Sequence, residues 1–263
     1  MDYRSILYQK RGGKAIITLN RPRALNALTQ ETIEELLNAI QEASLDPEVR
    51  VLILTGAGRA FCFGADISEF SRQIATGTPD SGILLLRKAQ EVIRLLTSIP
   101  KPTIAALNGF ATGLGLDLAL ACDLRVAAQR AKLAEAFITM GLIPDGGGTF
   151  TLPRLVGLAK AAEMIFIGEP LNASEAERIG LVNRVVPTEE LAKATENLAD
   201  KLAKSPCLAL GRAKQALWKN LAGDLASALK VEAQIQLTCL ASDDHREAVQ
   251  AFLEKREPVF RGT

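Results

Sequence analysis

Short apolar runs alternate with helix-periodic runs along the first half of the chain. Residues 15–19 (AIITL) and 51–55 (VLILT) are short, apolar and rich in β-branched side chains, and each is followed by a turn signal. Both runs therefore predict buried strands. Residues 103–107 (TIAAL) and 124–128 (LRVAA) predict two further strands of the same kind.

Helical spacing marks the segments between these strands. Thr29 is placed to cap a helix that carries apolar residues on one face from Ile33 to Ile40. Residues 81–98 predict a second amphipathic helix, and residues 115–122 predict a third. Strands that alternate with helices in this way predict an α/β fold with a largely parallel sheet covered by helices.

Helical patterns dominate the chain after Pro153. A single short strand is expected at residues 181–186, among helices at 159–167, 174–179, 189–204, 206–221, 225–240 and 243–255. No Gly/Ser-rich linker occurs near residue 200. We therefore expect a core over residues 1–200 and a helical region over 201–263 that packs on the core or on a neighbouring subunit.

Composition excludes several classes of protein. The chain has 263 residues, of which 48% are hydrophobic and 23% charged, which is typical of a folded domain. Its formal charge of +1 gives no support for a nucleic-acid-binding surface. No uncharged apolar stretch approaches the roughly 20 residues of a membrane span, and the N-terminus lacks a signal pattern. Four cysteines without C-x-x-C spacing predict free thiols, and we expect a cytoplasmic protein.

Few residues are available for chemistry. The chain has one histidine, His245, no G-x-S-x-G motif and no metal-ligand cluster, so no metal site is expected. Residues 56–58 (GAG) follow a predicted strand, but the third glycine of a dinucleotide fingerprint is absent. Any enzyme chemistry is therefore expected to use carboxylates and backbone amides.

Two glycine-containing loops are candidate anion sites. Gly113 and Gly115 precede or open a predicted helix, whose first N–H groups point outward and favour negative charge. The loop at 63–67 (FGADI) could supply a second backbone donor, which would complete an oxyanion hole. The alternative is that these glycines only permit close packing of helix and strand.

Two aspartates are the candidate acids. Asp117 lies in an apolar run (LGLDLALAC), where burial would raise its pKa. Asp145 precedes three glycines (PDGGG). The alternatives are a helix-start aspartate for the first and a turn former for the second.

Several of these segments resemble the crotonase superfamily, the enoyl-CoA hydratase/isomerase family. The resemblance covers residues 14 to 261 and rests on NRPRALNAL (20–28), GRAFCFGADI (58–67), KPTIAALNGFATGLGLDLALACD (101–123), GLIPDGGGT (141–149) and SDDHREAVQAFLEKR (242–256). It implies a spiral of ββα turns with a helical C-terminal trimerisation region. It also implies a homotrimer or a dimer of trimers.

The resemblance further implies an acyl-CoA thioester substrate, with coenzyme A as part of the substrate and no separate cofactor. Ala65 and Leu114 would supply the N–H groups of the oxyanion hole. The residues expected to line the CoA and acyl sites are Arg23, Ala24, Leu25, Asp66, Ile67, Phe137 and Lys255. Residues 201–263 would serve oligomerisation and close the CoA site.

The chain departs from the hydratase pattern of this family at both acid positions. Hydratases hold water between two glutamates, where this chain has Asp117 and Phe137. Glu135 is two residues from the second place, on the same face of an expected strand, and is a weak substitute. Asp145 instead matches the acid of double-bond isomerases, and its surroundings are similar to those of the ring isomerase of phenylacetate breakdown.

We therefore expect an enoyl-CoA isomerase in which Asp145 shuttles a proton, Asp117 assists and Phe137 excludes water. The alternatives are an enoyl-CoA hydratase, another crotonase-type activity such as a hydrolase or ring-opening lyase, and a non-catalytic acyl-CoA-binding protein.

Overall fold

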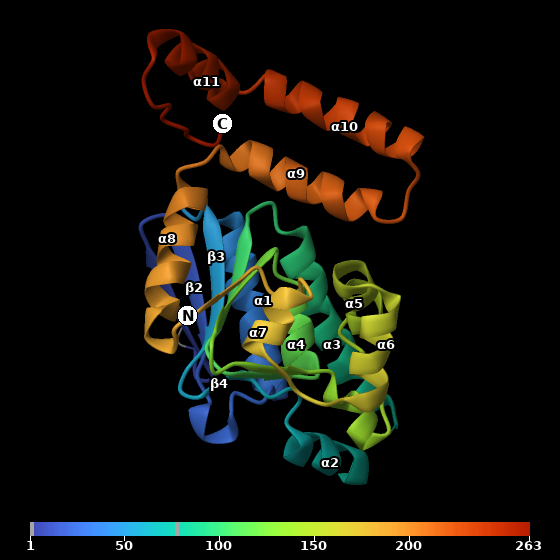
Figure 1. Cartoon of the computed structure of the whole chain (residues 1–263). Coiled ribbons are helices and arrows are strands. Elements are labelled where there is room, and N and C mark those ends of the chain that lie inside the picture. The colour runs from blue at the N-terminus through green and yellow to red at the C-terminus, as the bar shows by residue number, and fades with distance from the viewer. Residues whose placement is uncertain (1–2, 77–78) are drawn as a thin grey trace.

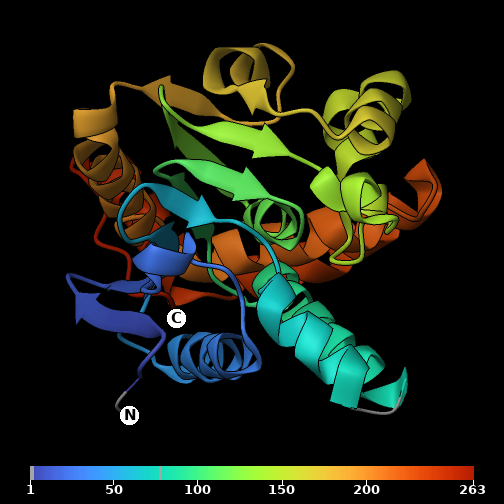
Figure 2. The ribbon, with the colours of Figure 1, turned by 90° about the horizontal axis from the view of Figure 1, so that it is seen from below.

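The strands form two separate sheets in the computed structural model, which describes residues 3–76 and 79–263 (Figure 1). The six-stranded sheet consists, in spatial order, of β1 (Ile6–Arg11), β2 (Lys14–Leu19), β3 (Val51–Gly56), β5 (Thr103–Leu107), β7 (Leu124–Ala128) and β10 (Arg184–Val186). The four-stranded sheet consists of β4 (Ala60–Cys62), β6 (Phe110–Thr112), β8 (Lys132–Ala134) and β9 (Leu171–Asn172). Figure 2 shows these short strands side by side.

The order of pairing produces a spiral. Strands β2, β3, β5, β7 and β10 run parallel, and only β1 is antiparallel in the larger sheet. Each of β3, β5 and β7 is followed by a short strand of the second sheet, β4, β6 or β8, before the chain enters helical segments and returns. The expected spiral of ββα turns is therefore present.

The helices match the periodic segments of the sequence within a few residues, but two helices, α2 and α5, were not predicted. In chain order they are α1 (Gln30–Leu45), α2 (Ile67–Thr76), α3 (Pro79–Ser98), α4 (Leu114–Leu120), α5 (Gly148–Val156), α6 (Leu158–Ile167), α7 (Ala173–Arg178), α8 (Leu191–Ala203), α9 (Cys207–Asn220), α10 (Leu225–Leu240) and α11 (Asp243–Glu254). Thr29 caps α1 as predicted, because its hydroxyl accepts from the N–H of Thr32 at 3.2 Å. Within residues 3–76 and 79–263, no helix combines the length and apolarity of a membrane span.

Apolar side chains cover both faces of the larger sheet. On β3, Leu52 and Leu54 join the main core, whereas Val51 and Ile53 join a smaller apolar layer that also contains residues of α8. Burial on both faces explains why these strands read as continuous apolar runs. The sheet thus forms a rigid base for the loops that follow the short strands.

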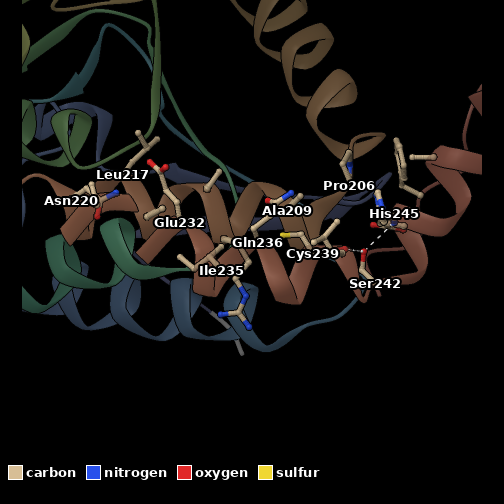
Figure 3. A pocket seen from close by; sticks show the side chains of 18 of the residues that line it. Pro206, Ala209, Leu217, Asn220, Glu232, Ile235, Gln236, Cys239, Ser242 and His245 are labelled. Carbon is tan, nitrogen blue, oxygen red and sulfur yellow. Dashed lines mark hydrogen bonds between the residues drawn. The ribbon is translucent and has the colours of Figure 1, made fainter. Parts of the chain in front are cut away.

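Helices α9, α10 and α11 extend beyond this core at one end of the molecule (Figure 1). A groove of about 870 Å³ lies between them, and its lining includes Leu217 of α9 and Ile235 and Cys239 of α10 (Figure 3). Leu229 and Leu237 of α10 are more than half exposed. An apolar surface of this kind fits the predicted oligomerisation region, and both the trimer and the division at residue 200 stay predictions.

Candidate active site

The loop after β4 lies directly against the first turn of α4. The Thr112 hydroxyl donates a 2.9 Å hydrogen bond to the carbonyl of Phe63, which ties the two segments together. A methyl group built on Gly64 would lie 3.7 Å from the amide nitrogen of Leu114. Both loops therefore present their backbone amides to the same small region.

Two backbone donors meet there, as the sequence predicts for an oxyanion hole. Leu28 pairs with the segment around Ala65 by donating to the carbonyl of Gly64 at 2.8 Å and accepting from Asp66 at 2.9 Å. That pairing leaves the Ala65 N–H unused, and Leu114 opens α4, where N–H groups have no helical partner. In the described part of the chain, neither amide donates to a backbone acceptor.

Gly64 sets the direction of the Ala65 amide. Its φ of +93° lies in a region that side-chain-bearing residues avoid, and a methyl group on it would lie 3.0 Å from the Thr112 carbonyl oxygen. We expect Gly64→Ala to lower kcat by about 10–100-fold, because a displaced amide stabilises the oxyanion less well. Steady-state kinetics with an enoyl-CoA would measure this loss.

Gly157→Ala is the matched control for this variant, since Gly157 has a similar φ of +79° but open space around it, between α5 and α6. A folded Gly64→Ala protein with the wild-type kcat would show that the Ala65 amide plays no part in turnover.

Asp117 is buried on α4, with 1% of its surface exposed. Its Oδ2 accepts a 2.9 Å hydrogen bond from the N–H of Gly146, while Oδ1 has no partner within the described residues. Burial raises the pKa of Asp117 and the nearby charge of Asp145 adds to that rise, whereas the backbone donors at Gly146 and Gly148 oppose it. The raised pKa that the apolar sequence context predicts is thus confirmed.

Asp145 occupies the loop before α5 and is only partly buried. The Gln90 amide of α3 holds this loop by donating to the Asp145 carbonyl at 2.9 Å. Oδ1 of Asp145 is shielded and has no hydrogen-bond partner in the described part of the chain. Burial raises the pKa of Asp145. The structure therefore brings together the two aspartates that the sequence singled out.

Glu135, which the sequence offered only as a weak substitute for the second acid, belongs to the same cluster. The expectation that it shares a strand face with Phe137 is wrong, because β8 ends at Ala134 and residues 136–140 form a 3₁₀ helix. Glu135 is fully buried, and burial, Asp117 and Asp145 together raise its pKa. The Phe137 ring lies beside Gly113, the residue before α4: a methyl group built on Gly113 would lie 3.6 Å from it.

The two segments predicted to bind CoA lie side by side. Arg23, Ala24 and Leu25 are in or next to a short 3₁₀ helix (Pro22–Ala24), and Leu25 accepts from the N–H of Phe63 at 3.1 Å. Asp66 is fixed by a 3.0 Å ion pair with Arg21. Ile67 opens α2 and is 47% exposed.

Two C-terminal residues lie away from the carboxyl cluster. Lys255 follows α11, at the opposite end of the molecule from α2 (Figure 1), so a single chain does not bring it to the predicted CoA segments. His245 is exposed in the first turn of α11, where its N–H donates to the Ser242 hydroxyl at 3.0 Å (Figure 3). Among the residues described, no group of His, Cys, Asp and Glu side chains is arranged to hold a metal ion.

Comparisons with known proteins agree with this geometry. The model of the enoyl-CoA hydratase/isomerase family matches residues 9–263. The crotonyl-CoA hydratase of Syntrophomonas wolfei is 39% identical over 99% of both chains. The 1,2-epoxyphenylacetyl-CoA isomerase of Escherichia coli K12 is 40% identical over 98% of both chains. A crystal structure of enoyl-CoA hydratase from Bacillus anthracis superposes with a TM-score of 0.94 at 36% identity, covering 99% of this chain and 100% of that one. The chain is thus an enzyme of the enoyl-CoA hydratase/isomerase family.

Proposed function

We propose that this enzyme shifts a carbon–carbon double bond in an enoyl-CoA thioester by moving a proton with Asp145. The supporting observation is the difference in access among the three acids: Asp117 and Glu135 are buried, and Asp145 is partly exposed with an unpartnered oxygen. The likeness to the isomerase of Escherichia coli supports the same assignment.

The proposed chemistry follows from the position of the backbone donors. The thioester oxygen would accept from the N–H groups of Ala65 and Leu114, which stabilise the enolate formed when a proton leaves the acyl chain. Asp145 would take a proton from C2 of a 3-enoyl chain and return it to C4, so the double bond moves to C2. Asp117 would assist as the second acid, and the Phe137 ring beside Gly113 would exclude water.

A hydratase is the second candidate, and one structural observation favours it. Glu135 lies in the same cluster as Asp117, so the chain does carry a second buried acid despite the phenyl ring at position 137. The relative from Syntrophomonas wolfei is named a crotonyl-CoA hydratase. Against hydration, the full burial of Glu135 withholds it from a substrate water.

Mass spectrometry in heavy water separates these reactions. A 3-enoyl-CoA and its 2-enoyl isomer would each be incubated with the protein. The isomerase predicts interconversion of the two isomers without addition of water, with a mass increase only from deuterium that replaces hydrogen. A product heavier by one water would instead identify the enzyme as a hydratase. Binding of both thioesters without any conversion would favour the non-catalytic acyl-CoA-binding alternative.

Coenzyme A is proposed to lie along Arg23–Leu25 and Asp66–Ile67 as part of the substrate, with no separate cofactor. Lys255 would contribute to a CoA site only in an oligomer, because within its own chain it follows α11, at the opposite end of the molecule from α2 (Figure 1). The homotrimer or dimer of trimers and the cytoplasmic location stay predictions.

A further inference from the structure

Glu135 is a buried acid that the proposed proton shuttle does not use. It has no exposed surface, and neither of its carboxyl oxygens has a hydrogen-bond partner within residues 3–76 and 79–263. The ion pairs of the described residues include none with Glu135, Asp117 or Asp145. An ionised carboxylate is strongly disfavoured in such surroundings, so the protonated form of Glu135 is favoured.

Asp117 is the acid that faces Glu135 across Gly148. A methyl group built on Gly148 would lie 2.6 Å from Asp117 Oδ1 and 3.1 Å from Glu135 Oε1. Neither oxygen has a hydrogen-bond partner of good geometry within the described residues, and the only donor that acts on this side of Asp117 there is the backbone N–H of Gly148. A side chain at position 148 would therefore collide with Asp117 and press on Glu135, so both carboxyls lie against the space that the glycine leaves.

The remaining oxygen of Asp117 is already occupied, because the N–H of Gly146 donates to Oδ2 at 2.9 Å. A proton on Glu135 would satisfy the other oxygen and hold the Asp117 carboxylate at both ends. The other charged group that acts on Glu135 is Asp145, which is negative and also favours the protonated form.

We propose that Glu135 is a positioning residue, which holds one proton between itself and Asp117 and donates it as a hydrogen bond to Asp117 Oδ1. The pair would then carry a single negative charge, as expected for two adjacent buried carboxyls that cannot both ionise. This role rests on the proposed function of Asp117 as the acid that assists Asp145.

Infrared spectroscopy tests the shared proton without any substrate. The wild-type protein at pH 7.5 is expected to show the carbonyl stretch of a protonated carboxylic acid in the difference spectrum against Glu135→Gln. A spectrum without that band would overturn the proposal. This result stands even if no enoyl-CoA proves to be a substrate, so it separates failure of the pair from failure of the proposed function.

Kinetics tests the positioning role with two variants. Glu135→Gln keeps a neutral donor toward Asp117, so we expect kcat to fall by no more than about threefold. Glu135→Met removes the donor, so we expect kcat to fall about 10–100-fold with KM nearly unchanged. The acid limb of the pH–rate profile should also move up by about one unit, because the ionised form of Asp117 loses a hydrogen bond.

Two kinetic outcomes would overturn the proposal. One is a Met variant with the wild-type kcat and pH profile. The other is a Gln variant as impaired as the Met variant, which would show that the proton itself is consumed and not merely donated as a hydrogen bond. If the Met variant does not fold, the Gln variant and the infrared band still decide.

Discussion

Replacing Asp145 by asparagine is expected to lower kcat by about 10³-fold, since the amide keeps the shape of the side chain but cannot accept a proton. The affinity for the CoA thioester should stay within about threefold of wild type, because neither oxyanion-hole amide contacts the altered group. Steady-state kinetics with a 3-enoyl-CoA, together with calorimetric titration of a CoA thioester, would measure both quantities.

The Asp145→Asn protein should be no less stable than wild type, because burial raises the pKa of Asp145 and the variant removes a group whose charge is disfavoured there. Asp243→Asn is a suitable control, since Asp243 is an exposed carboxylate on α11, at the other end of the molecule. A variant with wild-type kcat would exclude Asp145 as the proton carrier. A wild-type protein that binds thioesters but converts none would exclude catalysis altogether.

The larger strands could be predicted because they are continuous apolar runs bounded by turn signals, and most helices because their apolar residues repeat with the helical period. The run at 51–55 became β3, and residues 225–240 became α10. The short strands could not be predicted in the same way. Three residues, as in β4 (Ala60–Cys62), are too few to show a period, and their pairing partners come from distant segments. Even so, these short strands carry the loops of the site.

The acid cluster was predictable only in part, because the burial of one of its members depends on a short segment whose structure the sequence pattern does not show. Asp117 and Asp145 stand out in the sequence because glycines and apolar residues surround them. Glu135 does not, because its burial depends on where β8 ends and the 3₁₀ helix begins. The change from strand to 3₁₀ helix at this boundary sends the side chains of Glu135 and Phe137 in different directions, which a sequence pattern does not reveal.

Lys214 is a second residue whose role depends on packing that the sequence does not reveal. A lysine on an amphipathic helix is normally solvated, yet Lys214 of α9 is 6% exposed. Its ammonium group donates to the Leu96 carbonyl at 2.7 Å and forms a 2.8 Å ion pair with Asp123. Asp123 also accepts from the N–H of Thr103, so its carboxylate joins α9 to the start of β5.

Lys214→Met is therefore expected to lower the free energy of unfolding by about 3 kcal/mol, because it leaves the Asp123 carboxylate without its cationic partner and the Leu96 carbonyl without the ammonium donor. Part of the carboxylate is solvent-accessible, which keeps the loss at the lower end of the range for buried pairs. Urea titrations at equal protein concentration would measure the change.

Lys219→Met, an exposed substitution later on the same helix, should change stability by less than about 0.5 kcal/mol. Adding Asp123→Asn to Lys214→Met should recover part of the loss, since the double variant no longer has an unpaired carboxylate. Equal stability of Lys214→Met and wild type would mean that α9 is held to the core by apolar contacts alone. The expected loss of unfolding free energy would instead mean that the Lys214–Asp123 ion pair holds the C-terminal helices on the catalytic core. The apolar pattern of these helices gives no sign of that contact.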